Sequence, residues 1–499
     1  MMHTPPSVTT EPNSPHRKSF FDHLPLPSVR NRKGYHWFVV GTVCIGAFMA
    51  ALDASIINIA LPTMQKSFQV TMGAVEWVSL TYLLTLAALI IPLGRMADIF
   101  GRRWMYAIGF SVFIVGSFLC GISPTLAIMN GARVLQAIGA AMLQANSVAI
   151  ITAATPLSDR GKAIGIQGSA QGIGLSLGPA IGGAILSTIG WRWIFFVNVP
   201  VGIIGTLLGI LLLPRDEERK EKREPFDIWG AIVLAPTLVG IIYFVKEGQS
   251  AGWTSPIELV ALIVGVLGLI LFIAMELKKK TPLLDLKLFK FPQITIGNIT
   301  GVLSFASMYS VTLLGPFFLD RVMHLEPYQA GLLMMIVPIG MTIFTPISGI
   351  LADRYGARIL TVSGMAATML GGLALFLASG TLTYPMLVVG LFLVGSGLGL
   401  FTPPNNASVM NASPRNRLGV TGGILNMART LGMSLGVTLG GVSYEVMLSL
   451  QGIHNESTAT LSEMNIAYHQ AFLITGAVAL IAMFLSFSKR AAKKVEEAA

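Results

Sequence analysis

Fourteen apolar stretches of about 20 residues divide this chain, and they constrain its fold more than any other feature. At ~1.5 Å rise per residue, an α-helix of that length crosses the ~30 Å hydrocarbon core of a bilayer. With 53% hydrophobic residues, 12% charged residues and a mean hydropathy of +0.70, the chain cannot be an ordinary soluble domain. We therefore predict an all-α membrane protein with fourteen transmembrane helices. The predicted spans are 36–62, 74–94, 104–123, 126–152, 163–187, 193–213, 226–246, 257–276, 294–319, 328–350, 358–380, 384–411, 418–445 and 467–488.

A short motif occurs twice and indicates an internal duplication. The sequence GRMADIFGRR begins at Gly94 and GILADRYGAR begins at Gly349, so the frame G-x-x-A-D-x-x-G-x-R returns after 255 residues. Each copy ends one apolar stretch and opens the next, which predicts a tight turn between two membrane helices. Glycine lets backbones approach closely, and aspartate is favoured near the N-terminus of the following helix. Either copy alone would fit a basic turn with chance glycines, but the pair favours duplication.

The offset between the two copies also predicts the domain organisation. It maps the second span onto the tenth, and hence the first six spans onto the last six. Two pseudo-symmetric six-helix bundles with an inserted helix pair between them follow from this register. The start of the chain is rich in Pro, Ser and Thr, which is typical of a disordered tail. The predicted domains are a disordered cytoplasmic tail at 1–34, an N-terminal six-helix bundle at 35–213, linkers and the inserted pair at 214–290, a C-terminal six-helix bundle at 291–489 and a cytoplasmic tail at 490–499.

The distribution of basic residues predicts the orientation in the membrane. An even number of spans places both termini on one side. Of 34 Lys and Arg residues, 28 fall in the segments on that side, and only Lys66, Arg192, Lys246 and Arg321 fall in the opposite loops. Because cytoplasmic loops carry an excess of basic residues, both termini are expected in the cytoplasm. We therefore predict a multi-pass protein of the cell membrane, meaning the cytoplasmic or inner membrane, in contact with the lipid bilayer.

Several function classes do not fit the sequence. The net charge of +10 would suggest a nucleic-acid partner only if the basic residues clustered on a soluble face, and they do not. The seven His residues show no metal-ligand spacing, and no glycine-rich phosphate loop of the Walker type is present. The longest predicted loops have only about twenty residues, too few for a catalytic domain. We expect no enzyme activity, no cofactor and no metal.

One acidic residue lies deep within the first span. Asp53 precedes Pro62 by nine residues, which places it ~14 Å below the predicted outer boundary. A charged side chain at such depth costs ~2.5 to 3.5 kcal/mol on insertion scales, so Asp53 must face the protein interior. There it either holds a static ion pair or binds a proton whose affinity changes as water gains and loses access.

Arg133 is the natural partner of Asp53 for proton coupling. It follows Pro124, at the outer start of the fourth span, by nine residues and so reaches a similar depth. Its guanidinium stays charged and favours the ionised form of a nearby carboxyl. Gln136 lies one turn further on the same face and offers a hydrogen bond. A purely structural arginine, satisfied by backbone carbonyls, remains the alternative.

The fifth span carries a series of glycines. Helices with glycine at intervals of four present a groove into which another helix can press, and proline within a helix permits a bend. This combination suits a gating hinge, and it suits tight packing equally well. The hinge candidates are Gly174, Gly178, Pro179, Gly182 and Gly183.

Polar side chains within other spans are candidates for a substrate cavity. Arg429 lies near the midplane, ~18 Å from Arg417, where a permanent charge needs a reason. Glu445 and Asp320 lie near the outer ends of their spans and are interpreted as helix-end residues at water level. The cavity candidates are Asn58, Gln136, Gln167, Gln171, Asn426 and Arg429.

Four motifs resemble the major facilitator superfamily. Gly94 to Arg103 is similar to its signature between the second and third helices, and Arg133-x-x-Gln136-x-x-Gly139 to its fourth-helix motif. Gly174-x3-Gly178-Pro179-x2-Gly182-Gly183 resembles the antiporter motif of the fifth helix. The segment 52–62, the run 191–200 and the fourteen spans resemble the 14-span drug:proton antiporter branch, the QacA/EmrB type. The similarity covers nearly all of 36–488.

This resemblance implies multidrug efflux by alternating access, in exchange for protons, and with it antibiotic resistance. Carried over by position, Asp53 and Arg133 would handle the proton, and Gly178 with Pro179 would form the hinge. Acidic residues are sparse in the second half, so neutral, monovalent or anionic cargo fits better than multiply charged cations. The cytoplasmic gate would comprise Gly94, Asp98, Gly101, Arg102, Arg103 and Asp353.

Other functions remain open on the same sequence. A dedicated exporter of a self-made metabolite, such as an antibiotic, siderophore or lipid, would share the fold. A membrane-embedded enzyme or receptor would need a polar catalytic cluster or a sizeable soluble domain. The expected partners are small-molecule substrates and protons. A periplasmic adaptor is considered only for a Gram-negative source, and a monomer is expected otherwise.

Overall fold

The computed structural model describes residues 32–214, 227–279, 282–378, 382–414, 417–454 and 456–488, with the side chains of residues 249, 250, 353 and 419 left out. Within these residues it is helical throughout, and fourteen helices are long and apolar enough to cross a membrane. The prediction of an all-α membrane protein with fourteen spans is thereby confirmed. Most of the predicted tail at 1–34, and all of the tail at 490–499, lies outside the described residues.

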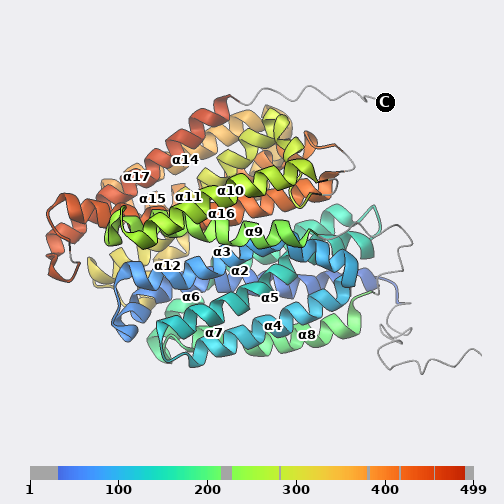
Figure 1. Cartoon of the computed structure of the whole chain (residues 1–499), viewed down its shortest axis with the longest axis horizontal. Helices are drawn as coiled ribbons and strands as arrows, with labels where there is room; N and C mark the ends of the chain where they lie inside the picture. The colour runs from blue at the N-terminus through green and yellow to red at the C-terminus, as the bar shows by residue number, and fades with distance from the viewer. Residues whose placement is uncertain are drawn as a thin grey trace, which may run out of the picture.

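The first six-helix bundle contains the first six spans, the last of which is formed by two consecutive helices (Figure 1). Its elements are α2 (Tyr35–Phe68), α3 (Met72–Phe100), α4 (Arg102–Ile122), α5 (Leu126–Ala154), α6 (Arg160–Thr188), α7 (Trp193–Phe196) and α8 (Asn198–Leu212).

The second six-helix bundle contains the last six spans, and the inserted pair precedes it in the chain. The inserted elements are α9 (Ile228–Glu247), η2 (Gly248–Gly252), α10 (Pro256–Lys278) and η3 (Leu286–Lys290). The second bundle consists of α11 (Pro292–Arg321), α12 (Pro327–Met334), α13 (Ile336–Tyr355), α14 (Ala357–Phe376), α15 (Thr383–Asn411), α16 (Leu418–Leu450) and α17 (Leu461–Phe487), with η6 (Glu456–Thr458) before α17.

Two ends of the molecule need names. We call the end where α2 begins and α17 ends the terminal side, and the opposite end the far side; in Figure 1 they lie at the right and at the left. Several helices that start on the far side have Ser or Thr caps. Thr71 accepts a hydrogen bond from Ala74 N–H at the start of α3, and Thr460 forms a capping box with Glu463 at the start of α17. Such caps satisfy the first free N–H groups of a helix.

The repeated motif forms equivalent turns in the two bundles. Gly101 between α3 and α4 has φ 98°, and Gly356 between α13 and α14 has φ 84°. Both values lie in the region that glycine enters without steric cost. Each glycine N–H donates to the carbonyl four residues back, at Ala97 and Ala352 respectively. The glycine at this place is therefore required by the backbone of the turn.

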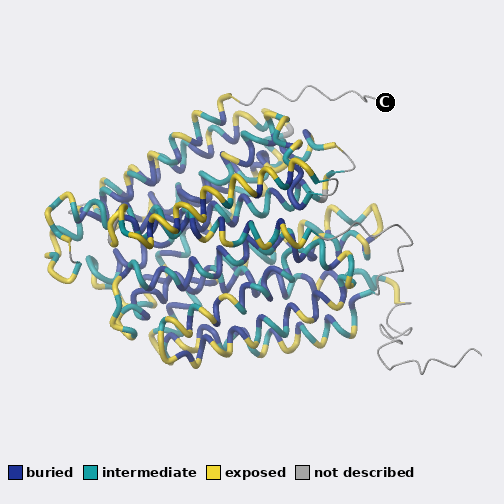
Figure 2. The backbone as a smooth tube through the Cα atoms, in the orientation of Figure 1, coloured by how far each residue is buried: buried dark blue, intermediate teal, exposed yellow. Residues whose placement is uncertain are grey.

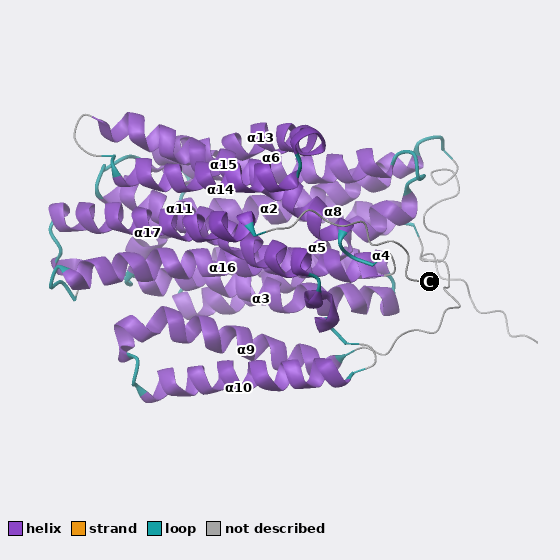
Figure 3. Cartoon of the chain, turned by 90° about the horizontal axis from the view of Figure 1, so that it is seen from above, coloured by secondary structure: helices purple, strands orange, loops and turns teal. Residues whose placement is uncertain are grey.

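Burial separates the central helices from the lipid-facing ones (Figure 2). In α11, 83% of the apolar stretch is buried, whereas in α10 the share is 17%. Figure 3 shows α9 and α10 as a pair along one side of the molecule. Helix α9 packs against α3 of the first bundle and α16 of the second, and α10 packs against α9. The inserted pair thus contacts both bundles, and α10 presents its apolar face to lipid.

The helix of the first span continues beyond the predicted end of that span at Pro62. Helix α2 continues through this proline to Phe68, so Asp53 lies fifteen residues, or ~22 Å, from its end. Proline lacks an N–H, so it removes a single hydrogen bond, and the packed surroundings of α2 keep the helix intact. Asp53 therefore lies near the middle of a helix of 34 residues.

Candidate functional site

Asp53 and Arg133 form a buried ion pair at the centre of the first bundle. Asp53 comes from α2 and Arg133 from α5, and Arg133 Nη1 lies 2.7 Å from Asp53 Oδ2. Their side chains are 1% and 0% exposed. The two charges cancel, which is the condition under which ions remain buried in a medium of low dielectric constant. The structure thus places Asp53 and Arg133 together, as the sequence predicted.

Amide side chains complete the environment of the Asp53 carboxylate. Gln136 Nε2 and Asn198 Nδ2 donate to Asp53 Oδ1 over 2.8 and 3.0 Å. Both amides also donate to Ser117 Oγ, and Gln136 Oε1 accepts from Arg133 Nη1 over 2.6 Å. Three side chains therefore donate hydrogen bonds to the Asp53 carboxyl group in this conformation. Protonation of the carboxyl would release Arg133 from its counter-ion.

Arg133 has further contacts beyond the ion pair. Its Nε donates to the Val78 carbonyl over 3.1 Å, and the guanidinium carbon lies 4.3 Å from the centre of the Tyr82 ring. Stacking on an aromatic face stabilises a desolvated cation. Nη2 of Arg133 is buried and has no hydrogen-bond partner among the described residues. The guanidinium is therefore held by a carboxylate and an amide as well as by one backbone carbonyl.

A narrow cavity lies beside this ion pair, between the two bundles. In this conformation it is too narrow to hold a water molecule. Arg133 and Tyr82 line it from the first bundle, and Tyr309 of α11 lines it from the second. Asn58 and Ser79 also line it, and Ser79 Oγ donates to Asn58 Oδ1 over 3.1 Å. Its walls carry two phenol rings, an amide group, a hydroxyl group and one cation.

The glycines of α6 form a close seam with α2. A Cβ atom at Gly174 would lie 2.6 Å from the Phe48 carbonyl, and one at Gly178 would lie 2.5 Å from Ser55 Oγ. Ser55 Oγ donates to the Leu175 carbonyl over 2.8 Å. This is the carbonyl that Pro179, four residues later, cannot bond because it has no N–H. A side chain of α2 thus satisfies the break in α6, and α6 remains one continuous helix.

The two bundles meet closely on the far side. Lys66 Nζ pairs with Asp320 Oδ2 at 2.7 Å, and Arg321 bonds to both Gln65 and Glu456. A Cβ atom at Gly331 of α12 would lie 2.3 Å from the Pro179 carbonyl of α6. These contacts close the far side between the halves.

The predicted gate residues lie on the terminal side. Arg102 donates to Asp98 Oδ1 over 2.7 Å, within the first bundle, and the Arg103 guanidinium donates to the Ile210 carbonyl of α8. Gly94 has ordinary contact distances to Ala145, so its place does not require glycine sterically. The side chain of Asp353 lies outside the described residues.

The remaining cavity candidates lie toward the terminal side and are not part of the ion-pair cluster. Arg429 Nη2 of α16 donates to Gln144 Oε1 of α5 over 3.1 Å, which bridges the two bundles. Its Nε is buried without a hydrogen-bond partner among the described residues. Gln167 is buried in α6, and Gln171 and Asn426 are half-buried. Among the described residues, the side chains of Gln167, Gln171 and Asn426 form no hydrogen bond with Asp53 or Arg133.

Several polar residues of this region were not identified as site residues from the sequence. Asn198, a direct partner of Asp53, was seen only as part of the run 191–200, although an amide within an apolar span is itself a signal. Lys246 was assigned to an outer loop, but it is buried in α9 against Glu76. The interpretation of Glu445 as a helix-end residue at water level was wrong, because its carboxylate faces Lys246 at 3.4 Å. Asp320 likewise pairs with a cation of the other bundle rather than capping α11.

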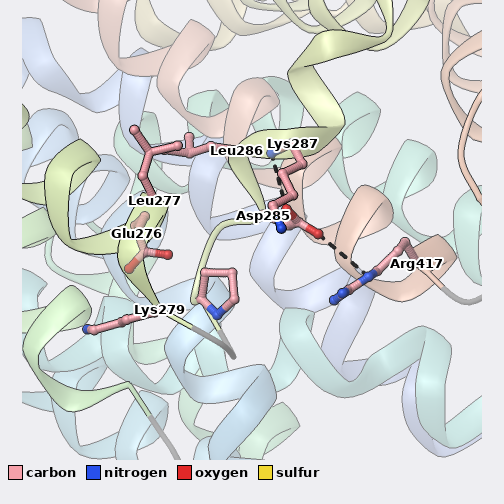
Figure 4. Close-up of a pocket in the computed structure, with 8 residues that line it drawn as sticks. Glu276, Leu277, Lys279, Asp285, Leu286, Lys287 and Arg417 are labelled. Carbon is pink, nitrogen blue, oxygen red and sulfur yellow. Dashed lines mark hydrogen bonds and ion pairs between the residues drawn. The ribbon is translucent and has the colours of Figure 1, made fainter.

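A second pocket lies on the terminal side, where η3 meets the start of α16 (Figure 4). Asp285 accepts from Lys287 N–H over 3.1 Å and pairs with Arg417 Nε at 3.5 Å. Nearby, burial acts to raise the pKa of Asp227, but hydrogen bonds from Lys279 and Gly230 N–H lower it overall. These contacts tie the inserted pair to α16, and the pocket is remote from the Asp53 ion pair.

Comparisons with known proteins give one family. A family model described as Major Facilitator Superfamily matches residues 43–437. The riboflavin transporter RibZ of Clostridioides difficile (strain 630) is 36% identical over 458 residues, which are 90% of this chain and 96% of the relative. The multidrug resistance protein Stp of Mycobacterium tuberculosis (strain CDC 1551 / Oshkosh) is 34% identical over 406 residues, covering 81% of this chain and 75% of the relative.

A solved structure shares the fold. The crystal structure of a bacterial homologue of the human lysosomal transporter Spinster, inward-facing and unoccupied, superposes with a TM-score of 0.64 at 17% identity. The match covers 92% of this chain and 97% of that chain.

Proposed function

Because this chain belongs to the major facilitator superfamily and is therefore a transporter rather than an enzyme, we propose that it exports small hydrophobic or amphipathic molecules in exchange for protons. The observation that carries the proposal is the buried pair of Asp53 and Arg133 beside a cavity between the two bundles. Exchange of cargo for protons requires a proton-binding group close to the place where the cargo binds. The similarity to Stp supports efflux as the direction of transport.

The proposed cycle begins from the conformation described above. With the far side closed, Asp53 is ionised and held by Arg133, Gln136 and Asn198. The excess of basic residues on the terminal side supports a cytoplasmic location for that side in the cell membrane. Cargo enters from the cytoplasm, the bundles tilt to open the far side, and the cargo leaves. A proton from the far side then binds Asp53 and returns to the cytoplasm when the bundles tilt back.

The cavity favours cargo that is neutral, aromatic or anionic. Tyr82 and Tyr309 offer aromatic faces, Asn58 and Ser79 offer hydrogen bonds, and Arg133 is the only charged side chain that lines it among the described residues. A carboxylate that would recognise a cationic compound does not line this cavity. Arg429 adds a second cation toward the terminal side.

A dedicated carrier of one metabolite is the second candidate function. The similarity to a riboflavin transporter over 90% of the chain is the observation that favours it. A planar heteroaromatic molecule would stack on the tyrosines and accept hydrogen bonds from the amide and hydroxyl groups of the cavity. A panel of dyes, antibiotics and flavins in one efflux assay separates the candidates. Efflux of several unrelated compounds supports multidrug export, and transport of flavins alone supports the dedicated carrier.

Asp53→Asn tests proton coupling directly. In proteoliposomes with an imposed pH gradient, the wild-type chain is expected to accumulate cargo against its concentration, and the variant is not. Exchange of labelled for unlabelled cargo at equal pH should persist, because asparagine keeps the shape and the hydrogen bonds of a neutral site.

Glu326→Gln is the matched control, since Glu326 is an exposed carboxyl on the far side. It should leave accumulation unchanged. Uphill transport at the wild-type rate by Asp53→Asn would remove Asp53 from the coupling mechanism.

A further inference from the structure

A second buried group of charges lies on the far side, where three different parts of the molecule meet. Lys246, at the end of α9 in the inserted pair, lies 2.9 Å from Glu76 of α3 in the first bundle and 3.4 Å from Glu445 of α16 in the second. The side chains of Lys246 and Glu76 are 1% and 0% exposed, and that of Glu445 is 26% exposed. We call these three residues the lysine cluster.

The backbone leaves room for the lysine cluster at two glycines. A Cβ atom at Gly441 of α16 would lie 2.3 Å from Glu76 Oε2. A Cβ atom at Gly73 of α3 would lie 2.7 Å from Glu445 Oε1 and 3.1 Å from Lys246 Nζ. Any other residue at either position would push a charged group aside. The carboxylates therefore occupy places that the opposite bundle provides.

The charges of the lysine cluster do not cancel. One lysine faces two carboxyl groups, so full ionisation leaves one unpaired negative charge. Glu76 Oε1 and Glu445 Oε2 are buried without a hydrogen-bond partner among the described residues, and Glu76 Oε2 has the salt bridge to Lys246. A buried charge without full compensation is costly, whereas a protonated carboxyl is not. The structure thus favours one proton shared by the two carboxyl groups.

Neighbouring charged groups do not supply the missing positive charge. Glu247 of α9 accepts from Trp77 Nε1 over 2.7 Å, Glu258 lies buried at the start of α10, and Glu456 of η6 pairs with Arg321 of α11. Three of these four groups are acidic, and the fourth, Arg321, already has a counter-ion. The surroundings therefore increase the tendency of the lysine cluster to bind a proton.

We propose that Glu76, Lys246 and Glu445 form a second proton-binding site, which holds one proton while the far side is closed and releases it to the far side when the bundles separate. The proposal rests on the alternating access of the proposed function. Because Glu76 and Glu445 belong to different bundles, opening the far side pulls them apart. Lys246 then keeps one carboxylate as its counter-ion, and water stabilises the other in its ionised form.

This site regulates the cycle without carrying its proton across the membrane. The closed far side binds one proton more than the open one, so by linkage a lower pH outside favours closure. In an exchanger driven by external protons, acid outside would therefore speed the return of the emptied carrier. The proton of the lysine cluster enters and leaves on the same side, unlike that of Asp53.

Distance measurements between spin labels test the proposal. Labels replace Ile122 at the far end of α4 and Tyr384 at the far end of α15, which are each 51% exposed. Cys44 and Cys120 become alanine, and Asp53→Asn is the background, so that the coupling carboxyl no longer titrates. In nanodiscs, the distance distribution gives the populations of the open and the closed far side. The ratio of the open to the closed population should rise by up to about tenfold for each unit of increase in pH, as one proton is released.

Glu445→Gln is the decisive variant. It leaves Glu76 and Lys246 as a neutral pair, so the closed distance should predominate and no longer respond to pH. Glu76→Gln has the same expected result and serves if the first variant does not fold, and Glu326→Gln should keep the full response. An unchanged pH response in both cluster variants overturns the proposal. The proposal is also overturned if the ratio of open to closed populations depends on pH in the chain that keeps Asp53 but not in the Asp53→Asn background. That result would assign the pH dependence to Asp53 and would leave the proposed function standing.

Discussion

At the residue scale, the Asp53 carboxylate is controlled by the groups that donate to it. Arg133 supplies the charge, while Gln136 and Asn198 supply neutral hydrogen bonds from α5 and α8. A hydrogen bond to an ionised group contributes about 1.5 to 3 kcal/mol, so each donor shifts the balance between the charged and protonated forms. Removing one amide should change the pH dependence of transport without removing the proton site.

Asn198→Ala is expected to move the pH dependence of export to higher pH. The ionised carboxylate loses one donor, so it binds a proton more readily, and one pH unit corresponds to about 1.4 kcal/mol. We expect the midpoint of the pH profile in proteoliposomes to rise by about one unit. Asn58→Ala is the comparison, because the Asn58 amide lines the cavity beside the ion pair and bonds to Ala54 and Ser79 rather than to Asp53. A profile displaced to lower pH in Asn198→Ala would contradict this assignment.

At the scale of the element, α6 combines a helix break with a close seam. Ser55 of α2 satisfies the carbonyl that Pro179 leaves free, and Gly178 lies directly against Ser55. The sequence left open whether these glycines serve packing or bending. The contacts account for packing at Gly174, Gly178 and Gly182, each of which lies against α2. Their role as a hinge stays a prediction.

Gly178→Ala should destabilise the protein, and Gly168→Ala on the same helix should not. The new methyl group at 178 would meet Ser55 Cβ at 2.6 Å, whereas at 168 nothing lies within 4 Å. Overpacking of this kind costs about 1 to 3 kcal/mol, while replacing an open helical glycine by alanine gains up to about 1 kcal/mol. Thermal unfolding in detergent measures both. Equal melting temperatures for the two variants would show that the seam yields without cost.

At the scale of the whole molecule, the two bundles are held together on the far side by contacts of different strength. Lys246 and Glu76 of the lysine cluster are buried, whereas the side chains of Lys66 and Asp320 are 66% and 23% exposed. Exposed pairs contribute about 0.2 to 1 kcal/mol and weaken in salt. The Lys66 pair is therefore a weak contact that biases the far side toward closure, and the buried contacts dominate.

Reversing this pair tests how it biases the bundles. Lys66→Glu should raise the population of the open far side by at most about thirtyfold, because an attraction of at most about 1 kcal/mol becomes a repulsion of similar size between exposed groups. The double variant Lys66→Glu with Asp320→Lys should restore the wild-type population. The spin labels at Ile122 and Tyr384 report both, at low and at high salt. An effect that persists at high salt would mean that the substitution acts through packing rather than charge.

The sequence by itself determined the number of spans, and it predicted the duplication and the inserted pair. A bilayer core contains no water, so a spanning segment must satisfy its own backbone as a helix, and length and hydropathy suffice to find it. Residue counting along the two helices also predicted that Asp53 and Arg133 lie at similar depths, where they pair. What counting along one helix does not give is its rotation and its neighbours.

Only the tertiary structure decided which side chains meet across helices. It turned Asn198 toward Asp53, matched Ser55 to the carbonyl freed by Pro179, and continued α2 through Pro62. It also buried Lys246 between carboxyl groups of two bundles, where the sequence indicated a loop lysine. These contacts join residues far apart in the chain, and their energies depend on burial and on distances of a few ångström. No local pattern encodes them, because they exist only once the bundles have packed.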